Sequence, residues 1–122
     1  MVKAYCIIEH SAQTVFTCIV DSAIRRSWDK VFDEFKTVDE GDGFEVLYYS
    51  IKTPFGITKR DFLQRRTHIL DYPEKNSITM HFTSIDHPLM PVRRKIVRAL
   101  TLISGYIIRP ISANKCSLTI IS

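Results

Sequence analysis

Two arginines of this 122-residue chain fall within otherwise apolar patterns, and they are its clearest chemical signal. Arg66 lies in a predicted strand over residues 59–70, where every second side chain is expected on the same face. That face carries Phe62, Gln64, Arg66 and His68. Arg25 lies at the end of a predicted apolar helix, just before Trp28. Both arginines are therefore expected beside apolar side chains, where an arginine needs a partner.

Two roles compete for these arginines. The first is a structural ion pair, for which the candidate partners are Asp21, Asp29 and Asp61. The second is a pair of charge-assisted hydrogen bonds to a phosphate or another polar group of a ligand, which suits the planar guanidinium group. The sequence patterns leave both roles open for each arginine.

Other motifs with a defined chemistry are missing from the sequence. It contains no P-loop, no dinucleotide-binding glycine motif, no nucleophile elbow, and no HExxH or CxxC motif. Its four histidines and three cysteines show no metal-ligand spacing. We therefore predict no catalytic residue, no metal, no cofactor and no enzymatic activity. Nucleic-acid binding is not predicted either, because a base-stacking motif is lacking.

Composition describes an ordinary globular chain. Apolar residues make up 45% and charged residues 25%, which excludes a disordered tail, a collagen-like repeat and a coiled coil. The length suits one domain, predicted over residues 1–122. No apolar run is long enough for a membrane-spanning helix, and no secretory leader is visible at the N-terminus. Three scattered cysteines favour a reducing, cytoplasmic compartment.

Charge is distributed unevenly along the chain. Residues 1–61 carry 8 basic and 10 acidic side chains, whereas residues 62–122 carry 9 basic and 3 acidic ones. The second half therefore favours anionic partners such as phosphate groups or membrane surfaces. Its basic run Arg93-Arg94-Lys95 is expected to be either a solvated surface or a contact with lipid headgroups.

The elements that position these residues are predicted to be one helix and a series of strands. Ser11 is a suitable N-cap for a helix that ends near residues 25–28, with an apolar stripe that includes Val15 and Ile19. Strands are predicted over residues 3–9, 44–52, 59–70, 78–83, 94–109 and 116–121. Residues 85–92 form a loop, and residues 110–114 a hairpin turn. This order predicts an α+β fold in which an antiparallel sheet wraps around the helix.

Several short segments follow one another in the order of a known family. The helix end DSAIRRSWD (21–29) comes first, followed by KTPFG (52–56), RDF (60–62), Arg66, Arg98 and SGYI (104–107). Together they resemble the START domain, the StAR-related lipid-transfer family, with residues 86–95 as its long loop. The amino-acid sequences of the KTPFG and RDF segments are most similar to those of phosphatidylcholine transfer protein and its relatives.

This resemblance implies a helix-grip fold, in which a curved antiparallel sheet surrounds a helix and an apolar lipid tunnel. It implies non-enzymatic binding and intermembrane transfer of a lipid, with a glycerophospholipid such as phosphatidylcholine favoured. Arg25 would contact the phosphate, and Arg66 would be the arginine of the cavity. The implied tunnel-lining residues are Ile19, Leu47, Tyr49, Ile51, Phe62, Ile78, Met80, Phe82 and Ser104. The implied membrane-contact loop contains Leu89, Met90, Arg93, Arg94 and Lys95.

Two departures from the family keep alternatives open. Ile19 stands where phosphatidylcholine binders have a tyrosine, and Ser104 where they have a glutamine, so a sterol is the alternative ligand. The chain is also shorter than family members, and we expect it to be partial, without the terminal helices that lid the tunnel. Because an unlidded groove exposes apolar surface, the alternative function is an interaction module that forms a homodimer. For a lipid carrier we expect a cytoplasmic protein that contacts membranes transiently.

Overall fold

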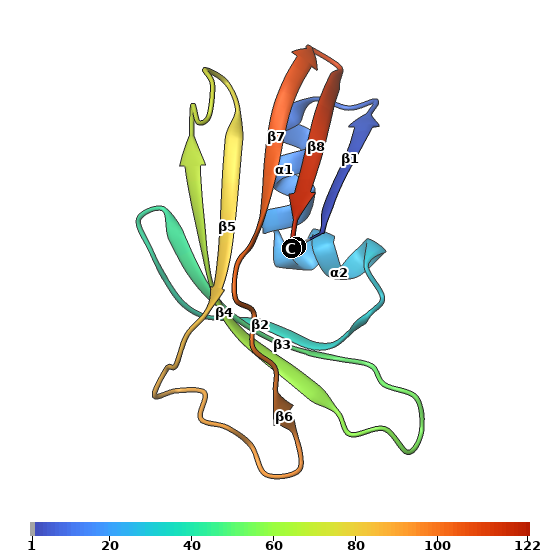
Figure 1. Cartoon of the computed structure of the whole chain (residues 1–122), viewed down its shortest axis with the longest axis vertical. Coiled ribbons are helices and arrows are strands. Elements are labelled where there is room, and N and C mark those ends of the chain that lie inside the picture. The colour runs from blue at the N-terminus through green and yellow to red at the C-terminus, as the bar shows by residue number, and fades with distance from the viewer. Residues whose placement is uncertain (1) are drawn as a thin grey trace.

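A computed structural model describes residues 2–122, which form one eight-stranded sheet and two short helices (Figure 1). In chain order the elements are β1 (Lys3–Ile8), α1 (Ala12–Val20), α2 (Ser22–Trp28), β2 (Phe32–Gly41), β3 (Phe44–Ile51), β4 (Arg60–Leu70), β5 (Ile78–Ser84), β6 (Val97–Arg98), β7 (Ser104–Ser112) and β8 (Lys115–Ile121). The predicted α+β class is confirmed. The described residues contain no helix long and apolar enough to cross a membrane.

Seven strands form a continuous antiparallel sheet in the order β1-β8-β7-β5-β4-β3-β2. The short strand β6 pairs in parallel with the start of β4. The sheet curves strongly, so that β2 and β3 cross below β7, β8 and α1 in Figure 1. Five of the six predicted strands are confirmed to within one residue at each end.

The predicted single helix is in fact two helices that meet at Asp21. The Ser11 side chain caps α1 as expected, accepting a hydrogen bond from the Thr14 N–H at 3.1 Å. Asp21 has an extended backbone and its carboxylate accepts from the Ile24 N–H at 3.0 Å, so it ends α1 and caps α2. Aspartate favours this position because its side chain replaces a missing helical partner. The break sets α2, and with it Arg25, at a new angle.

Two other predictions are corrected. Strand β2 was not predicted, because its many charged residues obscure the alternation of apolar side chains. The long strand predicted over residues 94–109 is interrupted, since residues 99–103 lie outside the sheet between β6 and β7. There the Thr101 N–H donates to the Ser84 hydroxyl at 2.7 Å, and the Ser84 N–H donates to the Thr101 carbonyl at 3.2 Å. These bonds hold the segment against the end of β5 instead.

Opposite faces of the sheet carry two separate cores. On the face covered by α1, Val15 and Ile19 pack with Ile78, Met80 and Ile108 of β5 and β7. On the other face, a smaller cluster contains Val46, Tyr48, Leu63 and Met90. Residue 90 belongs to the long loop between β5 and β6, so this loop covers the second face. The uncovered part of the first face, beside α2, is where the candidate site lies.

Candidate functional site

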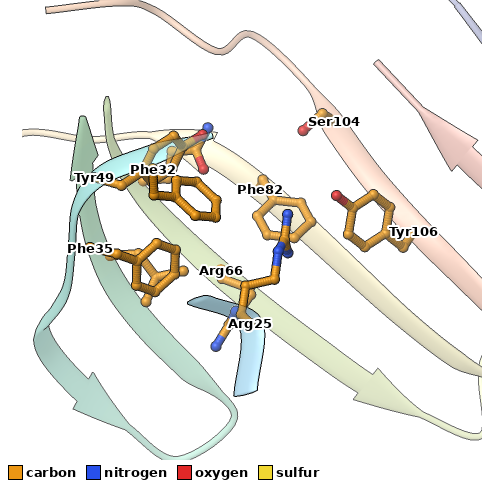
Figure 2. A pocket seen from close by; sticks show the side chains of 10 residues that line it. Arg25, Phe32, Phe35, Tyr49, Arg66, Phe82, Ser104 and Tyr106 are labelled. Carbon is orange, nitrogen blue, oxygen red and sulfur yellow. The ribbon is translucent and has the colours of Figure 1, made fainter. Parts of the chain in front are cut away.

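A cavity of about 100 Å³ lies between α2 and the curved sheet, where both predicted arginines meet. Figure 2 shows the rings of Phe32, Phe35 and Tyr49 on one side of it and those of Phe82 and Tyr106 on the other, with the two arginines between them. The complete lining is Arg25, Phe32, Phe35, Leu47, Tyr49, Gln64, Arg66, Phe82, Ser104 and Tyr106. The cavity therefore combines two cations with an aromatic wall.

Strand alternation and register bring these side chains together. Antiparallel neighbours place residue 49 opposite residue 62, residue 45 opposite residue 66, and residue 66 opposite residue 82. Every second residue of each strand then faces the same side. Gly105 allows β7 to approach β5 closely, because a Cβ at this position would lie 2.5 Å from the Met80 carbonyl oxygen. Ser104 and Tyr106, on either side of this glycine, reach the cavity as a result.

Arg66 is the more deeply buried arginine, and its side chain is only 4% exposed. Its Nε donates to the Glu45 carboxylate at 3.0 Å, and its Nη2 donates to the Val20 carbonyl at 3.2 Å. The second bond satisfies a carbonyl in the last turn of α1, which a cation stabilises. Arg66 therefore ties β4 to β3 and to the end of the helix while it lines the cavity.

Arg25 is held by its own helix. Its Nε and Nη2 both lie 3.1 Å from Oδ2 of Asp29, one turn later in the sequence. The guanidinium also lies over the rings of Trp28, at 5.0 Å, and Phe32, at 5.4 Å. Such cation–π contacts stabilise a partly buried arginine. The structure thus contains the predicted ion pair with Asp29, whereas the partner of Arg66 is Glu45, which was not predicted.

The aromatic wall consists of two groups of rings in contact. Tyr49 stacks on Phe62 with ring centroids 4.8 Å apart, and it meets Phe32 edge to face at 5.2 Å. Phe82 and Tyr106 form a second edge-to-face pair at 5.2 Å. Burial raises the pKa of the Tyr49 hydroxyl from 10.0 to about 12, so this group keeps its proton at neutral pH and also in moderately alkaline solution. It can therefore donate a hydrogen bond to a ligand in the cavity.

The predicted tunnel-lining residues divide into two groups. Leu47, Tyr49, Phe82 and Ser104 line the cavity, together with the two arginines. Ile19, Ile78 and Met80 do not, because α1 packs directly on this part of the sheet and fills it as core. Phe62 lies behind Tyr49, and Ile51 is half-buried at the end of β3, so neither belongs to the lining.

The predicted membrane-contact loop is also divided. Met90 is only 7% exposed and belongs to the second core, which contradicts its place at a membrane surface. Arg93 donates two hydrogen bonds to the Glu34 carboxylate, at 3.1 and 3.2 Å, and its guanidinium lies over the ring of Tyr48. Leu89, Arg94 and Lys95 are exposed.

Sequence reasoning missed four lining residues and the ion-pair partner of Arg66; one of the four, Gln64, was placed on the face of Arg66 but not assigned to the site. Glu45 could have been found, because it shares a strand face with Leu47 and Tyr49, which were predicted. Tyr106 likewise shares a face with Ser104. Phe32 and Phe35 could not be placed, since the strand that carries them was not predicted.

A second buried network lies on the opposite face of β4. Asp61 is 1% exposed and accepts hydrogen bonds from the Tyr48 hydroxyl and from Nε of Arg98, both at 2.8 Å. Arg98 also donates to the carbonyls of Met90 and Pro91, each at 3.3 Å. Burial, aided by the bond to Asp61, raises the pKa of Tyr48 to about 12. This network anchors the long loop to the sheet. Nowhere in residues 2–122 do three metal-binding side chains converge.

Comparison with known proteins now identifies the family. The family model described as START domain matches residues 1–122. The chain belongs to the START family. Within this family it resembles human START domain-containing protein 10, with 30% identity over 112 residues, covering 88% of this chain and 36% of the relative. It also resembles human StAR-related lipid transfer protein 7, mitochondrial, with 26% identity over 97 residues, covering 78% of this chain and 26% of that protein.

Structural comparison supports the same START fold. The crystal structure of human STARD10 matches with a TM-score of 0.86 and 24% sequence identity. The match covers 97% of this chain and 49% of that chain. The START sequence described here therefore spans about half of that structure, and about a third of the START domain-containing protein 10 sequence. The predicted curved antiparallel START architecture is confirmed.

Proposed function

We propose that this START chain binds a glycerophospholipid, such as phosphatidylcholine, without catalysing a reaction, and carries it between membranes in the cytoplasm. The observation that carries the proposal is the meeting of two arginines and an aromatic wall in one cavity. Residues 1–122 would form a single lipid-binding domain. Its family relative, StAR-related lipid transfer protein 7, is named for lipid transfer.

The donors around the cavity suit a phosphate group. Guanidinium groups form short, charge-assisted hydrogen bonds with phosphate oxygens, and the hydroxyls of Tyr49, Ser104 and Tyr106 add neutral donors. Arg25 is the better candidate for direct contact, because its side-chain hydrogen bonds go only to Asp29, one turn away, and its side chain is 17% exposed. Arg66 is fixed by bonds to two other elements and sets the charge of the cavity floor.

The size of the cavity limits which part of the lipid it takes. Sites for drug-sized molecules measure roughly 300–1,000 Å³, whereas this cavity measures about 100 Å³. We therefore assign it to the headgroup end of the lipid. The acyl chains require apolar space beyond this cavity, and their burial would supply most of the affinity, at about 0.8 kcal/mol for each CH₂ group.

Native mass spectrometry of the freshly purified chain, followed by organic extraction, tests this proposal. We expect a bound adduct of glycerophospholipid mass. Arg25→Ala should reduce its occupancy about tenfold, the effect of losing one charged hydrogen-bonding partner. Arg26→Ala is the matched control, because its side chain is exposed and does not line the cavity.

Other results would redirect the proposal. Equal lipid occupancy in Arg25→Ala and the parent would contradict the proposed contact between Arg25 and the phosphate. A sterol in the extract would show that the ligand is a sterol, the alternative class, and not a phospholipid. A dimer without lipid would favour the interaction module.

A further inference from the structure

We infer that the edge strand β1 pairs with β1 of a second copy, which joins two chains into one continuous antiparallel sheet. The two strands run in opposite directions about a two-fold axis at Cys6. This assembly goes beyond the proposed lipid binding and does not depend on it, since no residue of β1 lines the cavity.

The outer side of β1 carries backbone groups without a partner strand in residues 2–122, because β1 ends the sheet (Figure 1). Val2 and Ser122 exchange both backbone hydrogen bonds, at 2.6 and 2.9 Å. Alternate residues of an antiparallel strand turn their N–H and C=O groups to the same side, so the even-numbered residues of β1 bond to β8. Lys3, Tyr5 and Ile7 therefore direct these groups away from the sheet, where a further strand can bond to them.

The two edges of the sheet differ in the features that prevent such pairing. At the other edge, β2 contains two register shifts, and five of its ten residues are charged. Bulges and charged side chains both protect an edge strand. In contrast, β1 keeps one regular register with β8 and contains a single charged residue, Lys3, and no proline. Its Tyr5 and Ile7 side chains are 65% and 45% exposed, so β1 is the edge that is suited to pairing.

A second copy fits this edge because the strand is complementary to itself. When Cys6 faces Cys6 of the second copy, Tyr5 lies opposite Ile7 of that copy, and Lys3 lies opposite Glu9. An aromatic side chain beside a β-branched one, and a cation beside an anion, are cross-strand pairs that stabilise a sheet. The two-fold axis forms each of these pairs twice. Since β1 has one free edge, the assembly ends at two chains.

The charges at the two ends of the strand favour this register. Lys3 is exposed and forms no ion pair with another residue in 2–122. The Glu9 side chain is 76% exposed, and its carboxylate lies 3.6 Å from Nζ of Lys115, too far for a hydrogen bond. Glu9 is therefore available to a second cation. A shift of one copy by two residues would place Lys3 opposite Ile7 or Ser11 instead.

Sedimentation velocity of the 122-residue chain at increasing concentration tests the inference. One six-residue strand is smaller than a standard interface, so we expect a monomer–dimer equilibrium with a micromolar dissociation constant. Tyr5→Pro should weaken dimerisation about tenfold, because it removes an outward N–H in each copy and no bond to β8. Tyr5→Thr is the matched control, and its loss should be smaller because it keeps this N–H. Both variants should keep the lipid adduct and the thermal midpoint of the parent.

Charge reversal tests the register with exposed residues. Lys3→Glu and Glu9→Lys should each weaken dimerisation about fivefold, because like charges would then meet twice. The double variant Lys3→Glu/Glu9→Lys should restore the affinity of the parent. Lys115→Ala removes the contact of Glu9 within its own chain, and Lys75→Glu reverses an exposed charge in the turn between β4 and β5. Both of these controls should dimerise like the parent.

Oxidative crosslinking tests the position of the two-fold axis. Facing residues of a non-hydrogen-bonded antiparallel pair have Cα atoms about 4.5 Å apart, within the roughly 4.4–6.8 Å that disulfides span. Cys6 occupies such a position in the proposed dimer, since its N–H and C=O groups bond to β8. Diamide, a two-electron oxidant, should therefore join the two Cys6 thiols as a disulfide and take up both protons. Cys6→Ser should abolish this crosslink, whereas Cys18→Ser should not.

Several results would overturn the inference. A monomer at every concentration would exclude a second copy as the partner of β1. A dimer that Tyr5→Pro leaves intact, or that crosslinks without Cys6, would place the contact on another surface. A double charge variant as weak as the single ones would contradict the register. The lipid adduct separates this inference from the proposed function, because an adduct without a dimer contradicts only the pairing of β1, and a dimer without an adduct contradicts only lipid binding.

Discussion

Two buried ion pairs lie on opposite faces of β4, five positions apart, and they differ in what surrounds them. Asp61 is enclosed by Tyr48 and Arg98, and its network binds the long loop to the sheet. Arg66 pairs with Glu45 and donates to the Val20 carbonyl, but it also lines a cavity with aromatic walls. The Asp61 carboxylate is enclosed by protein groups, although Arg98 borders a separate cavity of about 170 Å³ that has no aromatic wall, whereas Arg66 lines the cavity assigned to the headgroup.

This difference separates a structural role from a binding role. A buried charge must be paired, and removal of one partner leaves the other uncompensated. Where protein groups enclose the carboxylate, as around Asp61, the protein itself provides that compensation. Where a cavity adjoins the pair, as beside Arg66, an anionic ligand can provide it too. The comparison therefore predicts that only defects on the cavity side respond to added ligand.

The largest effect is expected at the closed pair. Asp61→Asn removes the charge that compensates Arg98 and should lower the free energy of unfolding by about 3–5 kcal/mol. Urea denaturation followed by circular dichroism measures this loss. Asp33→Asn, which breaks the exposed pair with Lys59, should leave the urea midpoint almost unchanged. Equal midpoints for Asp61→Asn and the parent would show that the closed pair contributes nothing to stability.

A smaller effect is expected at the cavity pair. Glu45→Gln should destabilise the lipid-free chain by about 2 kcal/mol, because Glu45 is partly exposed and Arg66 keeps its bond to the Val20 carbonyl. Added phosphatidylcholine should then raise the thermal midpoint of this variant more than that of the parent, since the phosphate replaces the lost carboxylate. The same addition should not rescue Asp61→Asn. If phosphatidylcholine raised the thermal midpoint of both variants equally, the proposed difference between the two faces would be wrong.

An effect that is absent at neutral pH and develops only above pH 10 concerns two tyrosines, one on each face. Burial raises the pKa of both Tyr48 and Tyr49 from 10.0 to about 12. The folded state therefore favours the neutral phenol, and stability is fully present below pH 10 and declines as the pH rises toward 12. Each tyrosine contributes at most about 1.4 kcal/mol for each pH unit in this window. Urea titrations at successive pH values should show a shallower decline in Tyr48→Phe, and an unchanged one in Tyr72→Phe, whose side chain is exposed.

Local patterns predicted much of this molecule. Alternation within β3 and β4 placed Leu47, Tyr49 and Arg66 on their faces before any partner strand was known. The cap at Ser11 and the pair between Arg25 and Asp29 also depend on neighbours within one helical turn. Family resemblance then supplied the curved sheet, which periodicity alone does not imply.

Other features escaped prediction because they arise from contacts between distant segments. Strand β2 is a charged edge strand that its own sequence disguises, and pairing with β3 stabilises it. Residues 99–103 have the apolar, β-branched composition of a strand, yet Leu100 and Leu102 are exposed because bonds to Ser84 divert the backbone. Met90 was expected at a surface and is buried, since the anchored loop folds it onto the sheet.

The sequence by itself determined which residue types face which side of each strand, and that two arginines would need partners. Arg25 has its partner, Asp29, one helical turn away, whereas only the tertiary structure decided the partners of Arg66 and Arg98. Glu45 lies 21 residues from Arg66, and Asp61 lies 37 residues from Arg98, so strand register and loop path set both pairs. A register slip of one residue would turn each side chain to the other face. Long-range pairing therefore distinguishes the closed network from the open cavity, and no local pattern encodes that difference.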